Sequence, residues 1–292
     1  MNATPSAVAT IQAPAKINLY FHITGRHKDG YHLVDSLIGF TTLGDELTIR
    51  ALEPLDIVSN GPFAEGMPPP HKNLVYRAVQ LLAENASNQA QAHVTITKNL
   101  PVAAGIGGGS SDAAAAIKAL SALWNMPHGT VDLYELGLTL GSDLPACLKA
   151  QTTYARGIGE VLDDAPILPE TGILLVNPGV TLMTASVFQA RRGVFNQPNR
   201  FDRSPKDAAA LAALLAERGN DLTDAAISLC PVIRNVLTAL EAAPGCLLAR
   251  MTGSGATCFG IFDDLAAAEA AAPAVAQDGW WVAPTELATG TT

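Results

Sequence analysis

Hydrophobic and polar residues alternate through much of the first fifty positions, and this pattern predicts β-strands there. Between residues 16 and 23 every odd position is apolar, whereas the even positions hold Lys16, Asn18, Tyr20 and His22. Successive side chains of a strand point to opposite faces, so we expect the odd positions in a core and the even ones on a polar face. A lysine on such a face is ordinarily solvated.

The remaining elements follow from the spacing of apolar residues and from the positions of glycine and proline. The predicted strands, after the strand-rich region from Ala7 to about Leu52, are 92–97, 152–156, 172–176, 246–251, 257–262 and 280–282. The predicted helices are 73–84, 111–123, 131–140, 185–192, 207–218, 231–242 and 265–276. A turn is expected at 25–30 and an irregular loop at 60–72. This mixed order predicts an α+β fold.

A linker at residues 163–170, which contains Pro166 and Pro169, divides the sequence into two predicted domains. These are residues 1–165 and residues 166–292. The length of 292 residues agrees with two domains of roughly 150 residues each.

Composition and charge narrow the classes of protein. The chain is 48% hydrophobic and 15% charged, which provides for a sizeable core and excludes a disordered protein. The net charge of −9 argues against nonspecific binding to nucleic acid or to an anionic membrane surface. No uncharged apolar run approaches the roughly 20 residues of a membrane-spanning helix, and the first ten residues lack the pattern of a secretory signal. The four cysteines form no CxxC pair, which favours reduced thiols and a cytoplasmic location.

A glycine-rich segment, PVAAGIGGGSSD at residues 101–112, joins a predicted strand to a predicted helix. Glycines let backbone N–H groups approach a ligand, and a helix N-terminus offers unpaired N–H groups to an anion. Ser110 and Ser111 are candidates to cap the helix or to bind the anion. The alternative is a tight strand-to-helix turn with a serine cap and no ligand.

Two common nucleotide motifs are excluded for this segment. A Walker A motif needs a lysine, and none lies between Lys98 and Lys118. The dinucleotide fingerprint GxGxxG starting at Gly105 would need glycine where Ser110 stands. Asp112 adds negative charge to the start of the helix, so we expect its side chain to point away from the anion or to lie near a metal.

Two further residues are candidates for chemistry. Asp143, in the sequence GSDLP, follows a predicted helix and is either a helix cap or a carboxylate that accepts a proton from a hydroxyl. Lys16 lies in a segment, residues 16–32, that holds Lys16, Arg26, Lys28 and three histidines against one aspartate. In an acidic chain this is the local positive charge that an anionic substrate requires.

Three segments together resemble the motifs of the GHMP kinase superfamily. They are PAKINL at residues 14–19, the glycine segment from Pro101 to Ala115, and MTGSGATC at residues 251–258. GRHKDGYH at residues 25–32, GSDLP, and the segment from Asn177 to Phe188 resemble most closely the members that act on a cytidine-diphosphate-linked methylerythritol in non-mevalonate isoprenoid biosynthesis. The resemblance covers about residues 8–285, and its most specific motif is GRHKDGYH.

The resemblance implies two α+β domains with an active site in the cleft between them, where ATP and a small-molecule substrate bind. Gly105 to Ser111 would wrap the triphosphate, and Asn73 and Leu74 would lie near adenine. The implied ATP-binding residues are Asn73, Leu74, Pro101, Gly105, Gly107, Gly108, Gly109, Ser110 and Ser111. Mg²⁺ is implied with ATP, and no protein ligand for it is assigned.

The resemblance also implies the catalytic and substrate-binding residues. Asp143 would be the general base and Lys16 its partner at the attacking hydroxyl. Tyr31, His32 and Phe188 would enclose cytosine, with Asn18 and Thr184 nearby. The family often has Tyr at the position of Phe188, which keeps the stacking and loses a hydroxyl. Gly253 and Gly255 are expected to support the glycine segment structurally.

The leading hypothesis is therefore an ATP-dependent kinase that phosphorylates the 2-hydroxyl of the cytidine-diphosphate-linked methylerythritol. The alternatives are another GHMP kinase, acting on homoserine, mevalonate or a sugar, and a catalytically silent nucleotide-binding protein. The aromatic residues separate the first two, because a simple polyol or amino acid offers no ring to stack on. We expect small-molecule substrates only, without nucleic acid or membrane, and a monomer or weak dimer in the cytoplasm.

Overall fold

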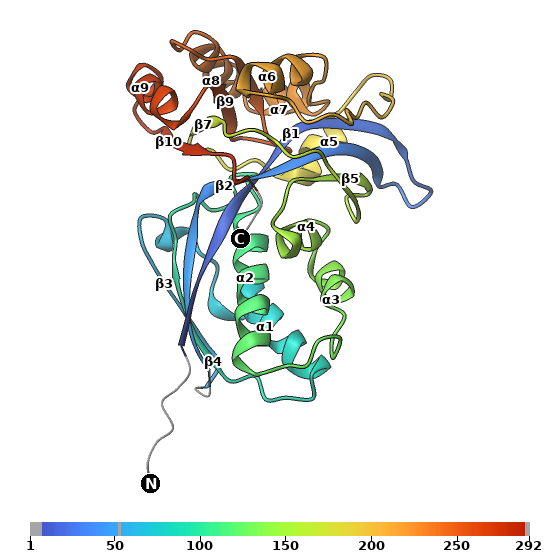
Figure 1. Ribbon diagram of the computed structural model, residues 1–292, viewed down its shortest axis with the longest axis vertical. Helices are drawn as coiled ribbons and strands as arrows, with labels where there is room; N and C mark the ends of the chain where they lie inside the picture. Colours follow the sequence, from blue (N-terminus) through green and yellow to red (C-terminus); the bar gives the residue numbers. More distant parts are fainter. Residues whose placement is uncertain (1–7, 52–53, 290–292) are drawn as a thin grey trace. The chain divides into compact units, whose positions relative to one another are not determined.

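The computed structural model describes residues 8–51 and 54–289, so that the predicted limits of the first strand region, Ala7 and Leu52, lie outside it (Figure 1). The chain forms two compact units, each assembled from separate stretches of sequence. The first unit comprises the chain up to Ala15, Gly44–Val102 and Gly107–Lys149; the second comprises Lys16–Leu43, Ala103–Ile106 and the chain from Ala150. The division of the sequence near residue 165 into two family domains stays a prediction.

In the first unit, strands and helices form separate layers. Its helices are α1 (Leu74–Asn85), α2 (Gly108–Leu123), α3 (Leu133–Leu140) and α4 (Leu144–Lys149), with short 3₁₀ turns at Ala64–Gly66 and Pro70–Lys72. Its strands are β3 (Asp56–Asn60), β4 (Ala92–Thr97) and the parts of β1 (Val8–Arg26) and β2 (His32–Ala51) that belong to this unit. The end of β2 pairs antiparallel with β4, and β3 pairs parallel with it.

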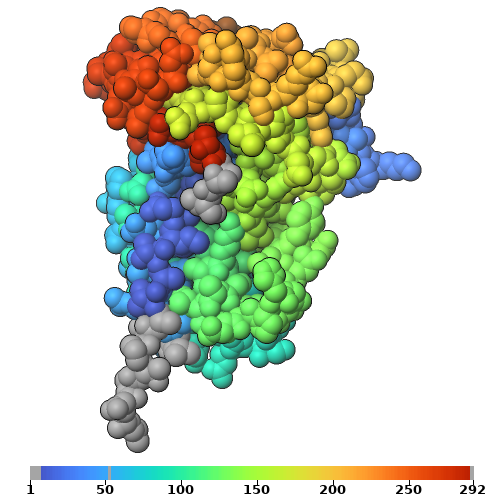
Figure 2. All heavy atoms as spheres, in the orientation of Figure 1, coloured from blue at the N-terminus to red at the C-terminus, as the bar shows by residue number. Residues whose placement is uncertain are grey.

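The helices of the first unit pack on one another. Helix α2 packs against both α1 and α4, and α3 packs against α4. Figure 2 shows α2, α3 and α4 as one continuous green patch on this face of the molecule. Helix α2 buries five alanines together with Ile117 and Leu120, and the small side chains let neighbouring helices approach closely.

The second unit holds a four-stranded antiparallel sheet in the order β10-β7-β9-β8. Its strands are β7 (Gly172–Asn177), β8 (Leu248–Met251), β9 (Cys258–Phe262) and β10 (Trp281–Glu286). Its helices are α5 (Thr184–Ala190), α6 (Ala208–Ala216), α7 (Thr223–Leu229), α8 (Val232–Glu241) and α9 (Leu265–Val275). Strand β7 is buried along its whole length, and β9 likewise, so this sheet forms the centre of the unit's core.

The early part of β2 extends the second unit by pairing antiparallel with β5 (Thr153–Gly157), which in turn pairs with β6 (Val161–Asp164). Asp35 of β2 stands opposite Arg156 of β5. Ile23 of β1 and Val34 of β2 contribute their side chains to the hydrophobic core of the second unit.

The α+β fold is confirmed, and most predicted elements are present within a few residues. Strands β3 and β6 and helices α4 and α7 were not predicted, because each is short and its pattern resembles that of a loop. The polar face of β1 is buried, which excludes the alternative that it is solvated: Lys16 is 4% exposed, Asn18 2% and His22 5%. Protein covers both faces of this strand, and a period of two cannot distinguish a polar face turned to solvent from one turned to buried partners.

The structure also bears on membrane-spanning helices and on the state of the cysteines. Within residues 8–51 and 54–289, no helix is both long enough and apolar enough to cross a membrane. The four cysteines are free; Cys147 and Cys258 are buried, and Cys230 and Cys246 are half-buried.

Candidate active site

The glycine segment delivers the chain into α2 through left-handed backbone. Gly107 is the N-cap, with φ of +66°, and the helix begins at Gly108. The predicted start of the helix at Ser111 is therefore three residues too late, and of the two roles considered for the serines the structure excludes the helix cap. Ser111 is buried instead, and its hydroxyl donates to the carbonyl oxygen of Pro14 at 2.7 Å. Glycine holds the cap position because a side chain disfavours a positive φ.

The first turn of α2 presents open backbone. The N–H of Ser111 is the first to find an acceptor inside the helix, the carbonyl oxygen of Gly107. The preceding N–H groups, of Gly108, Gly109 and Ser110, belong to the part of a helix that has no internal acceptors. Gly109 is exposed, and a Cβ placed on it would meet no protein atom within 4 Å. These groups and the helix dipole together suit a phosphate.

The beginning of the same glycine segment is built into the second unit. Gly105 has φ of +77°, and a Cβ there would overlap with the carbonyl oxygen of Gly255. The hydroxyl of Thr257 donates to the carbonyl oxygen of Ala104 at 2.6 Å. The N–H of Lys16 donates to the carbonyl oxygen of Ile106 at 2.9 Å. The turn at 252–255 therefore supports the glycine segment structurally, as predicted, and Gly105 is required by this close approach.

Asp112 is compensated by a buried lysine. Its carboxylate lies 2.9 Å from Nζ of Lys98, which also pairs with Asp45, and all three side chains are at least 98% buried. Asp45 in turn accepts the N–H groups of Asn99 and Leu100 at 2.7 and 2.9 Å. The network therefore joins the chain that enters the glycine segment to the N-terminal part of α2, just beyond its first turn. Of the two expectations for Asp112, the structure supports a side chain that pairs inside the protein.

The network carries two carboxylates against one ammonium, and its titration reflects this. Burial raises the pKa of Asp112 to about 7; the nearby charge of Asp45 acts in the same direction, and Lys98 opposes both. Burial lowers the pKa of Lys98, but the attraction of Asp112 and Asp45 outweighs it, so the net shift is upward and Lys98 stays charged.

Asp143 occupies a short exposed turn in the first unit, between the end of α3 and the start of α4. Its carbonyl oxygen accepts the N–H of Cys147 at 3.2 Å, so Asp143 directly precedes α4. Helix α4 packs against α2, whose first turn holds the open N–H groups. The side chain is thus presented at the surface of the unit by a rigid helical element.

Asn18 is held on one side and open on the other. Its N–H donates to the hydroxyl of Thr252 at 2.8 Å, and its amide nitrogen donates to the hydroxyl of Ser36 at 2.8 Å. The amide oxygen, Oδ1, is buried and has no hydrogen-bond partner. An acceptor left without a partner in this way costs free energy unless a ligand or water supplies a donor. Lys16 lies two residues earlier on the same buried face of β1.

The predicted aromatic residues are brought together in part. The rings of His32 and Phe188 have centroids 5.3 Å apart at 30°, and the ring of Phe21 meets Phe188 edge-on at 6.2 Å. Tyr31 is 61% exposed, so its predicted role in enclosing a base stays a prediction. Burial, followed by the charges of Arg26 and Arg191, lowers the pKa of His32. The imidazole is therefore neutral at physiological pH and offers one donor and one acceptor.

Other predicted residues have structural partners that the sequence did not reveal. Thr184 shares a hydrogen bond of 2.9 Å with Ser254 of the glycine turn. Asn73 caps α1 by accepting the N–H of Val75 at 2.9 Å, and Leu74 is the first residue of that helix. Pro101 lies half-buried directly before the glycines. The roles of Asn73, Leu74 and Pro101 toward ATP stay predictions.

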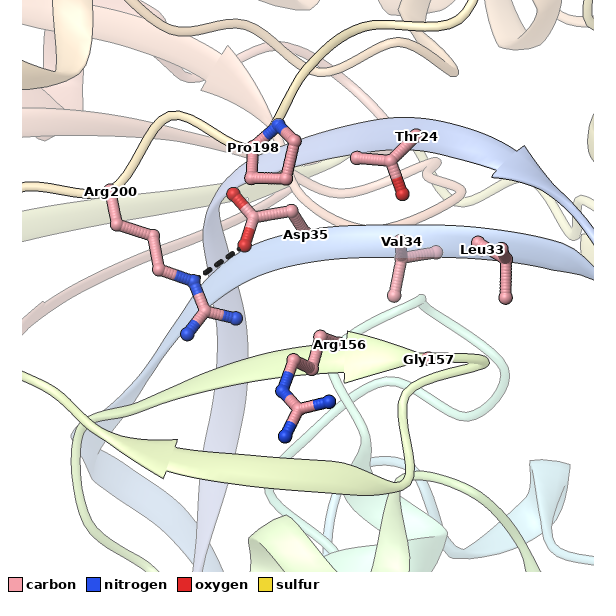
Figure 3. A pocket seen from close by; sticks show the side chains of 8 residues that line it. All are labelled: Thr24, Leu33, Val34, Asp35, Arg156, Gly157, Pro198 and Arg200. Carbon is pink, nitrogen blue, oxygen red and sulfur yellow. Dashed lines mark hydrogen bonds and ion pairs between the residues drawn. The ribbon is translucent and has the colours of Figure 1, made fainter.

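Sequence reasoning missed a polar network around Asp35 of β2, which includes Arg200. A pocket of about 440 Å³ is lined by Thr24, Leu33, Val34, Asp35, Arg156, Gly157, Pro198 and Arg200. Figure 3 shows Leu33 and Val34 reaching from β2 toward β5, and Asp35 turned toward Arg200. The available signal was a charged residue inside an otherwise apolar and hydroxylated strand, LVDSLIGF at residues 33–40.

The predicted site residues divide between the units. Asn73, Pro101, Gly107 to Ser111 and Asp143 belong to the first; Lys16, Asn18, Gly105, His32 and Phe188 belong to the second. The meeting of Asp143 with Lys16 therefore stays a prediction. Among the described residues no cluster of three or more His, Cys, Asp or Glu side chains could hold a metal ion. No residue is therefore assigned to Mg²⁺.

Comparison with known proteins identifies the family. Residues 73–151 match the model of the GHMP kinases N terminal domain, and residues 200–279 match the GHMP kinases C terminal model. The chain is 46% identical over 280 residues to the 4-diphosphocytidyl-2-C-methyl-D-erythritol kinase of Paramagnetospirillum magneticum, covering 95% of this chain and 98% of that one. The chain belongs to the GHMP kinase family.

Other relatives of this GHMP kinase support the same conclusion. It is 44% identical over 286 residues to the enzyme of the same name from Rhodospirillum rubrum, covering 97% and 94% of the two chains. A crystal structure of 4-(cytidine 5'-diphospho)-2C-methyl-D-erythritol kinase superposes with a TM-score of 0.79 at 32% identity, covering 97% of this chain and 100% of the other. A homoserine kinase from Cytophaga hutchinsonii, at 16% identity and a TM-score of 0.67, covers 98% and 97% of the two chains and shares the fold. This GHMP kinase is an ATP-dependent small-molecule kinase.

The Asp45–Lys98–Asp112 network predicts how the stability of the protein depends on pH. Asp112 binds its proton more tightly in the folded protein, with a pKa of about 7 against an ordinary 3.8, so the stabilisation is full below pH 4 and is lost as the pH rises through 7. In Asp112→Asn this loss should be absent. Between pH 4 and 7 the free energy of unfolding should therefore shift in favour of the variant by at most about 1.4 kcal/mol per pH unit.

Urea denaturation of both proteins at several pH values measures this difference. Asp202→Asn, at an exposed position, serves as the control and should run parallel to the wild type. Parallel curves for Asp112→Asn and the wild type would show that Asp112 is ionised throughout this range.

Proposed function

We propose that this protein transfers the γ-phosphoryl group of ATP to the 2-hydroxyl of 4-diphosphocytidyl-2-C-methyl-D-erythritol, a step of non-mevalonate isoprenoid precursor biosynthesis. The relatives from Paramagnetospirillum magneticum and Rhodospirillum rubrum, which are kinases of this compound by name, support this substrate. The observation in the structure that carries it is the contact between His32 and Phe188. Two facing rings offer a stacking surface that suits a pyrimidine base, whereas homoserine and mevalonate have no ring to place there.

The second unit supplies the groups that would recognise the cytidyl part. The neutral imidazole of His32 has one donor and one acceptor for the polar edge of cytosine. Phe188 provides a flat apolar face beside it. Tyr31, which is exposed at the tip of the β1–β2 hairpin, would cover the other face of the base. The unpartnered oxygen of Asn18 would accept a hydrogen bond from the substrate, with Thr184 nearby.

The first unit supplies the groups that would hold ATP. The open N–H groups at the start of α2 would bind the triphosphate, and the space in front of Gly109 allows its close approach. Phosphoryl transfer depends mainly on positioning and on stabilisation of charge. Mg²⁺ would arrive with ATP and not on a protein site of three or more carboxylate, histidine or cysteine ligands, since the described residues offer none.

Asp143 and Lys16 would perform the proton chemistry at the acceptor hydroxyl. An alcohol is a weak nucleophile at neutral pH, so a carboxylate that accepts its proton lowers the barrier to attack. The ammonium of Lys16 would stabilise the oxygen as negative charge develops on it. Because an adjacent positive charge favours an ionised carboxylate, Lys16 would also keep Asp143 able to accept the proton.

We propose that the protein is a monomer or weak dimer in the cytoplasm.

The substrate is tested by following ATP consumption with the cytidyl methylerythritol substrate, with mevalonate and with homoserine. Turnover with the first alone is the expected result. Turnover with mevalonate or homoserine instead would assign the protein to another GHMP kinase activity, and ATP binding without turnover of any of them would indicate a silent nucleotide-binding protein.

Asp143→Asn should retain the fold and the affinity for ATP but lower kcat by roughly 10²–10⁴, because the amide cannot accept the proton of the hydroxyl. Steady-state kinetics with the cytidyl substrate measure the change. Glu135→Gln, which removes an exposed carboxylate from α3 of the same unit, is the matched control and should leave kcat unchanged. Near-normal turnover of Asp143→Asn would remove Asp143 from the role of general base.

Gly109→Ala should leave the protein at least as stable as the wild type, because the new methyl group meets no protein atom and alanine favours a helix. It should nevertheless raise the KM for ATP at least about tenfold, because the methyl group would stand between phosphate and the N–H groups. Gly219→Ala, also in open space but in the second unit, is the control. An unchanged KM for ATP in Gly109→Ala would mean that the glycines form only a turn.

A further inference from the structure

Asp35 is the centre of a buried hydrogen-bond network three residues after His32 on β2. It is 1% exposed and accepts three donors: Oη of Tyr20 at 2.8 Å, the N–H of Asn199 at 3.1 Å and Nε of Arg200 at 2.7 Å. Burial, followed by the charge of Asp35, raises the pKa of Tyr20, so its hydroxyl keeps the proton that it donates. Tyr20 belongs to β1, and Asn199 and Arg200 belong to the chain after α5, so the network joins β2 to both.

Two of these donors belong to the segment that follows α5. This segment, residues 191–207, continues directly from the helix that carries Thr184 and Phe188. It is held at a second point by Asn196, whose N–H donates to the carbonyl oxygen of Ile23 at 2.9 Å. From Asn196 to Arg200 the segment is therefore held first to β1, at Ile23, and then to β2, at Asp35. The Asp35–Arg200 pair thus fastens the chain after Phe188 to the strand that carries His32.

The contact between the two rings is too weak to hold the two elements by itself. An aromatic pair contributes about 0.5–1.5 kcal/mol beyond its buried area. A hydrogen bond between a guanidinium and a carboxylate is roughly twice as strong as one between neutral groups, and the planar guanidinium also fixes direction. The distance between His32 and Phe188 is therefore determined mainly by the anchoring of their elements.

The same part of β2 also supports Asn18. Ser36, the residue after Asp35, accepts from the amide of Asn18 and donates to the carbonyl oxygen of Tyr20 at 2.6 Å. A shift of β2 at Asp35 would therefore move His32 on one side and the support of Asn18 on the other. Helix α2 and Asp143 belong to the first unit, whereas Asp35, Ser36 and Asn18 belong to the second.

We infer that Asp35 and Arg200 form a positioning pair for the nucleotide substrate: by tying β2 to the segment after α5, they set the separation of His32 and Phe188 and so the affinity for the pyrimidine ring. This inference rests on the proposed function. The pair acts through His32 and Phe188. The side chain of Arg200 is 28% exposed at the pocket of Figure 3, whereas that of Asp35 is 2% exposed, so the pair is best altered at Arg200.

Arg200→Met tests the inference, with Arg156→Met as the matched control. Arg156 lines the same pocket, and its guanidinium donates to Asp163 as that of Arg200 does; although Arg156 is the strand partner of Asp35, its guanidinium is not among the three donors to the Asp35 carboxylate. The measurements are the Kd for cytidine 5′-diphosphate by calorimetry, the KM for each substrate, kcat, and Tm. We expect Arg200→Met to weaken cytidine 5′-diphosphate about tenfold, with the KM for ATP unchanged and kcat within about twofold. Arg156→Met should bind as the wild type does.

A purely structural role would give a different result. It would lower the active fraction and hence kcat, with both KM values unchanged, or it would weaken both substrates equally; either outcome overturns the inference. Equal affinity of folded Arg200→Met and wild type for cytidine 5′-diphosphate overturns it while leaving the proposed function intact. A wild type that neither binds cytidine 5′-diphosphate nor phosphorylates the cytidyl substrate refutes the proposed function, and this inference with it.

If Arg200→Met does not fold, Arg200→Lys and Tyr20→Phe replace it. Lysine keeps the charge and loses the planar geometry, and phenylalanine removes one of the three donors to Asp35. Both should weaken cytidine 5′-diphosphate by a smaller factor, about twofold to fivefold, with the KM for ATP unchanged. Wild-type affinity in both variants overturns the inference.

Discussion

Asp112 lies just beyond the first turn of α2, so its negative charge would weaken the attraction of this helix end for a phosphate unless the charge is compensated inside the protein. Lys98 provides this compensation, since its ammonium lies between Asp112 and Asp45 in a site closed to solvent. Asp45 also takes the N–H groups of Asn99 and Leu100, so the same group that balances the charge orients the chain entering the glycines. Without this arrangement the negative charge of Asp112 would offset the positive end of the helix dipole and would repel an anion that approaches it.

The glycines have distinct functions that depend on their surroundings. Gly105 allows close packing on the turn at 252–255, and Gly107 turns the backbone into the helix. A Cβ on Gly108 would come within 3.1 Å of Nζ of Lys98, so this glycine protects the ion network. Gly109 faces open space, so the absence of a side chain there would serve a ligand and not the fold.

The proposed recognition of the nucleotide substrate would depend on elements that are far apart in the sequence. His32 belongs to a hairpin strand and Phe188 to a short helix, and 155 positions separate them, as the two residue numbers show. Their meeting requires that the hairpin and the segment after α5 be fastened to one another, which the network around Asp35 accomplishes. The unpartnered oxygen of Asn18 lies on the adjoining strand and is held there through Ser36. Stacking, hydrogen bonding and anchoring therefore act as one assembly in this unit.

The sequence by itself determined the α+β class, most helices and strands, the glycine segment and the family, because periodicity and short motifs are local properties of the chain. It also indicated that Asp112 points away from the anion or lies near a metal. It did not determine that the polar face of β1 is buried, that the helix begins at Gly108, or that Lys98 and Asp35 organise their surroundings. Those facts were decided by the tertiary structure, because a buried charge is stable only beside partners that the fold brings from distant positions, and no local pattern records which partners those are.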